Sequence, residues 1–350
     1  MTATSALPYR PLGASGLKVT PLWLGTMMFG DQTDEAEAAR IVAAARDAGV
    51  NAIDTANTYA GGESERITGR LIQADRSHWV LATKLANPVG SGPHDRGLSR
   101  RHIVQAVDAS LARLGTEWID LLYLHREDES TPLEETLQAI AHLVERGKVH
   151  HFGLSNFRAW RIARVAETCR AMGIGAPIAC QPPYNAMSRG IETELLPCCA
   201  HYGLGVVAYS PLARGVLSGK YAPGEAPPAG SRAARNDKRI LQTEFRPESL
   251  ALARRMAEHA EASGRTPTDL ALGWVWNNRR VDGVIAGPKT LAQWQGYLAA
   301  WGQPFDADDE AFVSGLVAAG HASTPQYSDP QYPVAGRVPR VGGADSGGSP

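Results

Sequence analysis

The sequence predicts an α/β fold, a single (β/α)8 barrel of the TIM type, from three observations. Short apolar runs alternate about eight times with amphipathic stretches, which is typical of a parallel sheet covered by helices. The chain has 350 residues, enough for eight strand–helix units plus insertions. The main alternative, an open doubly wound sheet, carries a G-x-G-x-x-G fingerprint after its first strand, and the segment LWLGTMMFGD at 22–31 has none.

The expected elements follow one another in a regular order. Residues 10–25 are expected to form a hairpin that turns at ASG (14–16) and closes the floor of the barrel. Helices are expected where apolar residues recur every three or four positions and a glycine ends the pattern. These segments are 34–49, 99–115, 160–172, 194–203 and 290–300. The expected strands are the apolar runs within 22–31, 50–59, 79–84, 118–125, 149–156, 177–182, 204–210 and 281–287.

Two segments fall outside this alternation. Residues 211–239, after the seventh strand, are rich in Gly, Pro and Arg and too irregular for a regular element, and a loop this long in a compact domain is usually a lid or ligand clamp. Residues 323–350 are rich in Pro and Gly; the first part is expected to pack along the barrel. We predict one domain at 1–340 and a disordered tail at 341–350.

Composition restricts the class of protein. The chain is 43% hydrophobic and 20% charged, with a formal net charge of −1, so it can bury a large core and offers no electrostatic attraction to nucleic acid or an acidic membrane. No apolar segment approaches the roughly 20 residues of a membrane span, and no signal-peptide pattern is visible. The cysteines have no CxxC spacing, and Cys198 and Cys199 are expected in a helix or the core. We expect a cytoplasmic protein, and no metal site is predicted.

Four polar residues in the first third of the chain follow apolar runs that are expected to be strands: Asp54, Tyr59, Lys84 and His125. In a parallel barrel such side chains converge on the active face. A tyrosine, with a pKa near ~10, donates a proton slowly at neutral pH. A neighbouring ammonium lowers that pKa, a carboxylate holds the ammonium, and a histidine can orient a carbonyl. Each residue alone is also compatible with a solvated strand end or a packed core.

The segments GVNAIDTANTYAGGESERITGRLI, VLATK, WIDLLYLHREDESTPLEETL, GKVHHFGLSN and YSPLARGVLSGKY closely resemble the aldo-keto reductase superfamily, and the resemblance runs from the hairpin to about residue 320. It implies a barrel enzyme that reduces aldehydes or ketones with NADPH, by hydride transfer from the nicotinamide to the carbonyl carbon. It assigns Tyr59 as the general acid, Lys84 and Asp54 as the residues that tune it, and His125 as the partner that orients the carbonyl.

The resemblance also implies how NADPH, rather than NADH, is held. Ser155, Asn156 and Gln181 hold the carboxamide, Tyr209 stacks on the nicotinamide, and the turn after Tyr209 approaches the pyrophosphate. The expected cofactor contacts are Thr26, Met27, Asp54, Ser155, Asn156, Gln181, Tyr209, Ser210, Pro211, Leu212, Arg214, Lys220, Arg232, Gly287, Lys289, Thr290 and Gln293. Lys289 and Thr290 open a helix, where the N-terminus favours an anion such as the 2′-phosphate. A Glu-Asn pair common further along this helix is replaced by Gly296 and Tyr297.

The partner expected from these residues is a small-molecule carbonyl substrate. Trp23, Met27, Met28, Phe29 and Leu85 suggest an apolar mouth suited to aromatic or aliphatic carbonyls. Two alternatives stay open: a cofactor-binding regulatory subunit, because the family includes potassium-channel β subunits with a similar 209–221 loop, and a barrel isomerase or aldolase that uses Lys84 as a Schiff base. The second leaves the three carboxamide-binding residues without a role. The physiological substrate, the oligomeric state and the physiological reaction direction are not predicted.

Overall fold

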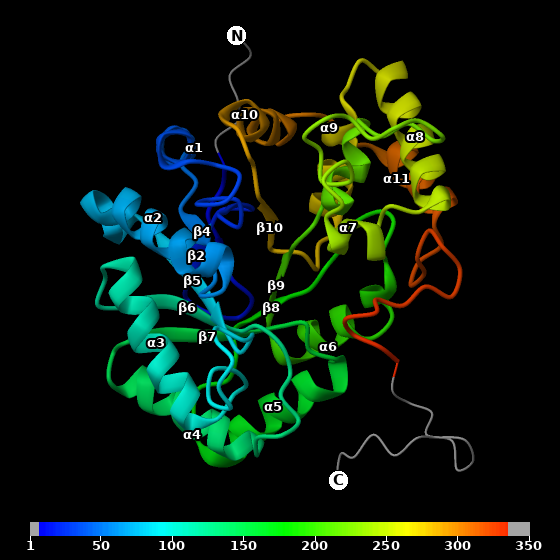
Figure 1. Ribbon diagram of the computed structural model, residues 1–350. Coiled ribbons are helices and arrows are strands. Elements are labelled where there is room, and N and C mark those ends of the chain that lie inside the picture. The colour runs from blue at the N-terminus through cyan, green and yellow to red at the C-terminus, as the bar shows by residue number, and fades with distance from the viewer. Residues whose placement is uncertain (1–6, 335–350) are drawn as a thin grey trace.

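The structure, a computed structural model, describes residues 7–334 and contains a closed barrel of eight parallel strands (Figure 1). Around the barrel the strands follow chain order, and the last one, β10, closes the ring between β9 and β3. The strands are β3 (Leu22–Gly25), β4 (Ala52–Asp54), β5 (Val80–Leu85), β6 (Ile119–Leu124), β7 (Val149–Ser155), β8 (Ala179–Gln181), β9 (Gly205–Ala208) and β10 (Gly283–Ala286). The predicted (β/α)8 barrel is therefore confirmed.

A short antiparallel hairpin of β1 (Arg10–Pro11) and β2 (Lys18–Val19) precedes the barrel. Its apolar residues Leu12 and Val19 are fully buried in the barrel interior. The backbone N–H of Ala14 donates to the carbonyl of Gly203 at 2.8 Å, directly before β9 begins. The contact is so close that a Cβ on Gly13, which has a φ of +56°, would lie 2.3 Å from the backbone nitrogen of Gly205. The hairpin thus closes the N-terminal end of the barrel, as predicted.

Helices surround the strands, with α8, α9 and α11 grouped on one side of the molecule (Figure 1). The first seven α-helices are α1 (Glu35–Asp47), α2 (Glu63–Ile72), α3 (Arg100–Leu114), α4 (Leu133–Glu145), α5 (Ala159–Met172), α6 (Leu195–Tyr202) and α7 (Lys238–Gln242). The others are α8 (Pro247–Ala262), α9 (Pro267–Asn277), α10 (Leu291–Ala300) and α11 (Ala307–Leu316), and four 3-10 turns are η1 (Tyr59–Gly62), η2 (Gln73–His78), η3 (Gly190–Glu192) and η4 (Ala213–Ser218). Cys198 and Cys199 lie in α6 as free thiols.

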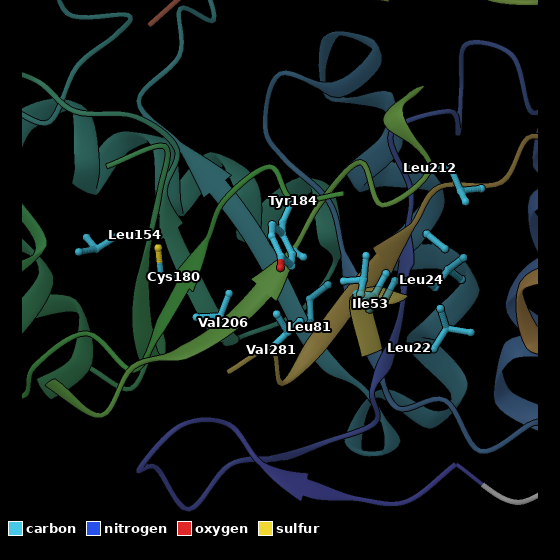
Figure 2. Packing of buried hydrophobic residues seen from close by; sticks show 14 of the residues in the cluster. Leu22, Leu24, Ile53, Leu81, Leu154, Cys180, Tyr184, Val206, Leu212 and Val281 are labelled. Carbon is cyan, nitrogen blue, oxygen red and sulfur yellow. The ribbon is translucent and has the colours of Figure 1, made fainter. Parts of the chain in front are cut away.

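The strand residues alternate between two layers of core. Leu22, Leu24, Ile53 and Leu81 face the surrounding helices and belong to the larger apolar cluster, part of which is shown in Figure 2. The residues between them face the barrel interior and form a smaller cluster with the hairpin, which includes Trp23, Ala52, Ala82, Leu121, Tyr123, Ala179, Val207 and Ile285. Because side chains alternate along a strand, the same period directs polar residues inward at the C-terminal strand ends.

The long segment after β9 is more regular than predicted. It contains η4, and α7 begins before it ends. The chain then continues as α8 and α9, which were not predicted. Residues 322–334 pack back on the body, where the guanidinium of Arg239 pairs with Asp329 and that of Arg246 lies 3.7 Å from the centroid of the Tyr327 ring. The predicted domain at 1–340 extends past the described residues, and the predicted disordered tail at 341–350 lies outside them.

Candidate active site

Asp54, Tyr59 and Lys84 form a hydrogen-bonded chain at the C-terminal end of the barrel. Asp54 ends β4, Lys84 lies near the end of β5, and Tyr59 begins η1. The ammonium Nζ of Lys84 donates to Asp54 Oδ1 at 2.5 Å, to the carbonyl of Thr55 at 2.7 Å and to the hydroxyl of Tyr59 at 3.0 Å. All three donors of the buried ammonium are therefore used, and one of them reaches the tyrosine that opens onto the cavity.

The strand register explains why these side chains meet. Asp54 is paired with Gly25 on β3 and with Ala82 on β5, so its side chain points inward at the same level as its neighbours. Behind Asp54, the Thr26 hydroxyl donates to the Asp54 carbonyl at 3.1 Å, and the Ser64 hydroxyl donates to the Thr26 carbonyl at 2.8 Å. This buried hydroxyl pair anchors the end of β4 to α2, and with it the carboxylate that holds Lys84.

Burial dominates the protonation of this chain of groups. It raises the pKa of Asp54 above its ordinary value, although Lys84 and Gln181 act in the opposite direction. Burial also raises the pKa of Tyr59, and the nearby Lys84 offsets only part of that effect. Lys84 therefore acts on the pKa of Tyr59 in the predicted direction, but burial outweighs it. Burial alone would lower the pKa of Lys84, but Asp54 and Tyr59 raise it.

The state of Lys84 bears on the Schiff-base alternative. A lysine becomes a nucleophile when its pKa falls and the neutral amine is populated. Lys84 is only 1% exposed, is fully hydrogen-bonded and has a raised pKa. Its ammonium form is thus stabilised, which disfavours the isomerase or aldolase reading.

His125 follows β6 and completes the predicted set. Its ring lies edge-on to the ring of Tyr59, with centroids 6.2 Å apart. Burial, together with the positive charges of Lys84 and Arg126, lowers the pKa of His125 to about 3. The imidazole is therefore neutral at ordinary pH and carries a single N–H. Its Nδ1 lies 3.1 Å from the side-chain Nδ2 of Asn87.

Ser155, Asn156, Gln181 and Tyr209 adjoin this set on β7, β8 and the end of β9. The Gln181 amide donates to Asp54 Oδ2 at 2.9 Å, and the Ser155 hydroxyl donates to the Gln181 carbonyl at 2.9 Å. The Tyr209 hydroxyl donates to Asn156 Oδ1 at 2.8 Å. Because the Asn156 amide also donates to the Ser155 hydroxyl at 3.0 Å, the three residues predicted to hold a carboxamide are linked to one another, and Gln181 links them to the carboxylate of Asp54.

One cavity of about 960 Å³ extends from these residues toward α9 and α10. Most of the predicted site lines it. The predicted residues along its wall are Thr26, Met27, Met28, Asp54, Tyr59, His125, Ser155, Asn156, Gln181, Tyr209, Ser210, Pro211, Leu212, Arg214, Lys220, Arg232, Gly287, Lys289 and Gln293. Gly296 and Tyr297 also lie along it. A volume of this size is at the upper end of the range for ligand pockets.

Cations gather along the wall formed by the long loop and the start of α10. Burial lowers the pKa of Lys220, and Arg232 lowers it further. Burial, Arg235, Lys220 and Arg232 together lower the pKa of Lys289. Arg232 pairs with Asp237, whereas Lys220 and Lys289 form no ion pair within the described chain. Mutually repelling cations in a cavity wall are what a polyanionic ligand would stabilise.

The backbone between β9 and η4 has an unusual conformation. Ser210, Ala213 and Arg214 all have positive φ angles, of 54°, 48° and 54°, and Gly215 has a φ of 96°. Left-handed residues in a tight turn can form anion-binding concavities, although the N–H groups of Ala213 and Gly215 already donate within this turn, to the carbonyls of Ser210 at 2.9 Å and Leu212 at 2.8 Å. Strain of this kind is held by the surrounding structure and clusters at ligand sites. Arg214 is additionally held by Glu244 at 3.0 Å.

Five predicted residues do not line the cavity: Lys84, which reaches it only through the Tyr59 hydroxyl, and Trp23, Phe29, Leu85 and Thr290. Trp23, Phe29 and Leu85 are at most 1% exposed and pack in the apolar core, so they do not form the substrate mouth. Strand alternation and the hairpin beneath Trp23 account for this correction. Thr290 is the N-cap of α10, with its exposed hydroxyl accepting from the Gln293 N–H at 3.3 Å.

The N-terminus of α10 is also less available than predicted. The carboxylate of Glu37 from α1 accepts the Leu291 N–H at 2.6 Å, and the Gln293 side chain accepts the Lys289 N–H at 2.8 Å. Since these backbone donors are occupied, a phosphate near α10 would depend on the side chain of Lys289 and on the cations of the long loop.

Several lining residues were missed at the level of sequence. Thr58, Asn87, Arg239, Gln331 and Tyr332 line the cavity, as do residues near the start of α9. Asn87 lies three positions after Lys84, a spacing that carries no signal by itself. Gln331 and Tyr332 come from the C-terminal segment, whose packing on the barrel was predicted without its contribution to the site. Within residues 7–334 no cluster of three or more His, Cys, Asp or Glu could hold a metal, and no helix is long and apolar enough to cross a membrane.

The fold and the site together define a parallel-barrel protein with a carboxylate–lysine–tyrosine chain beside a cation-lined cavity. Residues 21–317 match the aldo/keto reductase family, and the chain belongs to that family.

Relatives of two kinds are similar to this chain. A probable voltage-gated potassium channel subunit beta from Arabidopsis thaliana is 38% identical over 299 residues, which cover 84% of this chain and 91% of that protein. A protein of the same description from Oryza sativa subsp. japonica is 38% identical over 286 residues, covering 80% and 87%. The uncharacterized oxidoreductase YrpG of Bacillus subtilis (strain 168) is 34% identical over 338 residues, covering 91% and 99%.

Proposed function

We propose that this protein is an NADPH-dependent carbonyl reductase that converts aldehydes or ketones to alcohols. The observation that carries the proposal is the buried Asp54–Lys84–Tyr59 chain, which ends in a tyrosine hydroxyl at the wall of a large cavity. A general acid held next to a fixed ammonium is suited to giving a proton to a carbonyl oxygen.

The donor set along the cavity fits a nicotinamide dinucleotide phosphate. Ser155, Asn156 and Gln181 would hold the carboxamide, and the ring of Tyr209 would support the nicotinamide. The left-handed turn at 210–215 suits a pyrophosphate, and the uncompensated cations Lys220 and Lys289 suit a further phosphate. When bound, NADPH would supply the hydride that reduces the carbonyl carbon.

The chain's own residues would supply the proton. The Tyr59 hydroxyl would donate its proton to the carbonyl oxygen as negative charge develops there. Lys84, at 3.0 Å, would stabilise the resulting phenolate, and Asp54 would keep Lys84 in place. Neutral His125 would donate one hydrogen bond to the same oxygen and so orient it. Since burial raises the pKa of Tyr59, the phenolate depends on Lys84 for its stability.

The substrate would lie beside Met27, Met28, Thr58 and Tyr332, which line the cavity. Two thioethers and an aromatic ring suit an aromatic or aliphatic carbonyl. The nature of the substrate, the preference for NADPH over NADH and the cytoplasmic location stay predictions. Gly296 and Tyr297 face the part of the cavity between α9 and α10, where an adenine would lie.

The second candidate function is a cofactor-binding regulatory subunit with slow turnover. It is favoured by the similarity to two proteins described as potassium channel β subunits. Both candidates need the cavity and its cations, so cofactor binding alone does not separate them. The rate of carbonyl reduction does.

The experiment combines binding and turnover. NADPH is titrated into the wild type and into Tyr59→Phe, and its binding is followed by energy transfer from tryptophan to the cofactor. Then 4-nitrobenzaldehyde and a panel of other carbonyls are added, and NADPH consumption by both proteins is recorded. The proposal expects binding by both proteins and turnover by the wild type only. Absence of binding would refute both candidates, and binding with negligible turnover across the panel would favour the regulatory one. Equal turnover by Tyr59→Phe would refute Tyr59 as the proton donor.

A further inference from the structure

Asn87 faces His125 from the loop that follows β5. Its side-chain Nδ2 lies 3.1 Å from Nδ1 of His125, and both residues line the cavity. The other ring nitrogen of His125, Nε2, makes no hydrogen bond to a described residue. One edge of the imidazole is thus held by the protein, and the other is left for a ligand.

The backbone at this point is strained in a way that directs Asn87. Ala86 has a φ of 108°, a conformation that side-chain-bearing residues rarely adopt. It is buried, and its carbonyl accepts the Gly97 N–H at 2.9 Å. Such strain persists only where the surrounding structure enforces it, and it clusters at functional sites. Ala86 lies between the end of β5 at Leu85 and Asn87, whose side chain contacts His125.

His125 itself has little freedom of position. The backbone N–H of His125 donates to the Leu85 carbonyl at 2.8 Å, and the backbone carbonyl of His125 accepts from the side-chain amide of Asn156 at 2.9 Å. What these contacts do not decide is which ring nitrogen carries the proton. A neutral imidazole has one donor and one acceptor, and the hydrogen bond made by one nitrogen sets the state of the other.

From this geometry we propose that Asn87 is a positioning residue that fixes the tautomer of His125. The Asn87 amide donates to Nδ1, so the proton lies on Nε2 and points into the cavity. The substrate carbonyl then meets two donors, the Tyr59 hydroxyl and His125 Nε2–H. The catalytic role of Asn87 rests on the proposed carbonyl reduction, but the tautomer of His125 can be measured without turnover.

The charges around His125 agree with a permanently neutral ring. Lys84 on β5 and the adjacent Arg126 are the cations that disfavour imidazolium, and burial acts the same way. Tyr59 packs edge-on from η1 and is protonated at ordinary pH. Asn87 contributes no charge, so it can set the tautomer without raising the pKa of His125. An aspartate at the same position would do the opposite, because a carboxylate accepts from Nδ1–H.

The test compares the wild type with Asn87→Asp, Asn87→Ala and a control, Val89→Asp. The control adds the same charge two residues further along this loop, on a side chain that is 52% exposed. The tautomer is read from ¹⁵N chemical shifts of the histidine ring nitrogens, with His125 assigned from the spectrum of His125→Gln. Turnover of 4-nitrobenzaldehyde with NADPH is measured as a function of pH, and the Kd for NADPH checks that the cofactor site is intact.

For the wild type we expect the Nε2–H tautomer and no histidine ionisation in the rate profile above about pH 5, well above the lowered pKa of His125. In Asn87→Asp the pKa of His125 rises toward its ordinary value near ~6.5. The imidazolium below that pKa still donates from Nε2, but the neutral ring above it has its proton on Nδ1. The rate then falls as the pH rises, by about 10²–10³-fold relative to the wild type at high pH. Asn87→Ala loses roughly tenfold or less, without a new ionisation.

An Nδ1–H tautomer in the wild type would overturn the inference, as would an Asn87→Asp rate profile that matches those of the wild type and Val89→Asp. If the wild type reduces no carbonyl, the proposed function fails, while the ¹⁵N shifts of the wild type and Asn87→Asp still decide the tautomer.

Discussion

Lys84→Met should destabilise the fold mainly by leaving Asp54 buried without its counter-charge. The ammonium contacts Asp54 Oδ1 at 2.5 Å, and the side chains of Lys84 and Asp54 are 1% and 3% exposed. Methionine fills nearly the same volume but leaves the carboxylate with only the Gln181 amide at 2.9 Å as a partner. Breaking a buried ion pair in this way costs about 3–5 kcal/mol. We therefore expect the free energy of unfolding at pH 8 to fall by that amount.

The pH dependence identifies the cause. A carboxyl whose folded pKa is raised stabilises the fold at low pH, and this contribution is lost as the pH rises through the folded pKa. Burial already raises the pKa of Asp54, and removing Lys84 removes the main opposing influence. The variant should therefore be penalised less at pH 5 than at pH 8, with about 1.4 kcal/mol for each pKa unit of additional shift.

The assay is urea unfolding followed by fluorescence of the eight tryptophans; urea is chosen because guanidinium salt screens ion pairs. The double variant Asp54→Asn, Lys84→Met should be more stable than the sum of the single effects by about 2–3 kcal/mol. A Lys84→Met penalty that is equal at pH 5 and pH 8, together with additive single effects, would refute an energetically coupled buried pair.

Four further outcomes follow from the same geometry. Tyr59→Phe should keep the Kd for NADPH within about twofold but lower kcat by about 10²–10⁴-fold, a result contradicted by equal losses in binding and rate. The wild-type rate of carbonyl reduction should persist through about pH 9 and fall only as the pH rises through the raised pKa of Tyr59. A midpoint near neutrality in the pH profile would contradict Tyr59 as the proton donor. Lys220→Ala and Lys289→Ala should each weaken NADPH binding about tenfold at low salt and leave NADH binding nearly unchanged, as measured by fluorescence titration. Equal losses for both cofactors would show that the two lysines do not bind the 2′-phosphate. Ala86→Gly should relieve about 1–3 kcal/mol of backbone strain against roughly 0.5–1 kcal/mol of added chain entropy, so its urea midpoint should rise; a fall would show that no strain is stored there.

The barrel was predictable because its signals are local and repeated. Apolar runs that end in polar residues, such as those ending at Lys84 and His125, each report a strand and its active end. Strand alternation then places Asp54, Lys84 and Gln181 inward without further information. The additional helix α8 has one buried face and α9 is buried along most of its length, but the Gly-, Pro- and Arg-rich loop before them gives no signal for where regular structure resumes.

What the sequence could not predict depends on three-dimensional neighbours. Trp23 and Leu85 were predicted from the sequence to line the substrate entrance, but the hairpin beneath the barrel and the surrounding helices bury them. The N-terminus of α10 looks like an anion site until Glu37 from α1 is seen to occupy it. Likewise the pKa of Tyr59 follows from its burial, which residue types and spacing do not report.

The central claim is direct hydride transfer from NADPH to the carbonyl carbon, and isotopic labelling of the cofactor tests it most directly. NADPH deuterated at one face of nicotinamide C4 is mixed with the wild-type protein and 4-nitrobenzaldehyde, the opposite face is labelled in a parallel sample, and the alcohol is analysed by mass spectrometry. We predict one deuterium on the carbinol carbon from one of the two labelled cofactors and none from the other, because Tyr209 and the carboxamide-binding side chains would expose a single face. Alcohol without deuterium from either cofactor, or no alcohol at all, would contradict the proposed function.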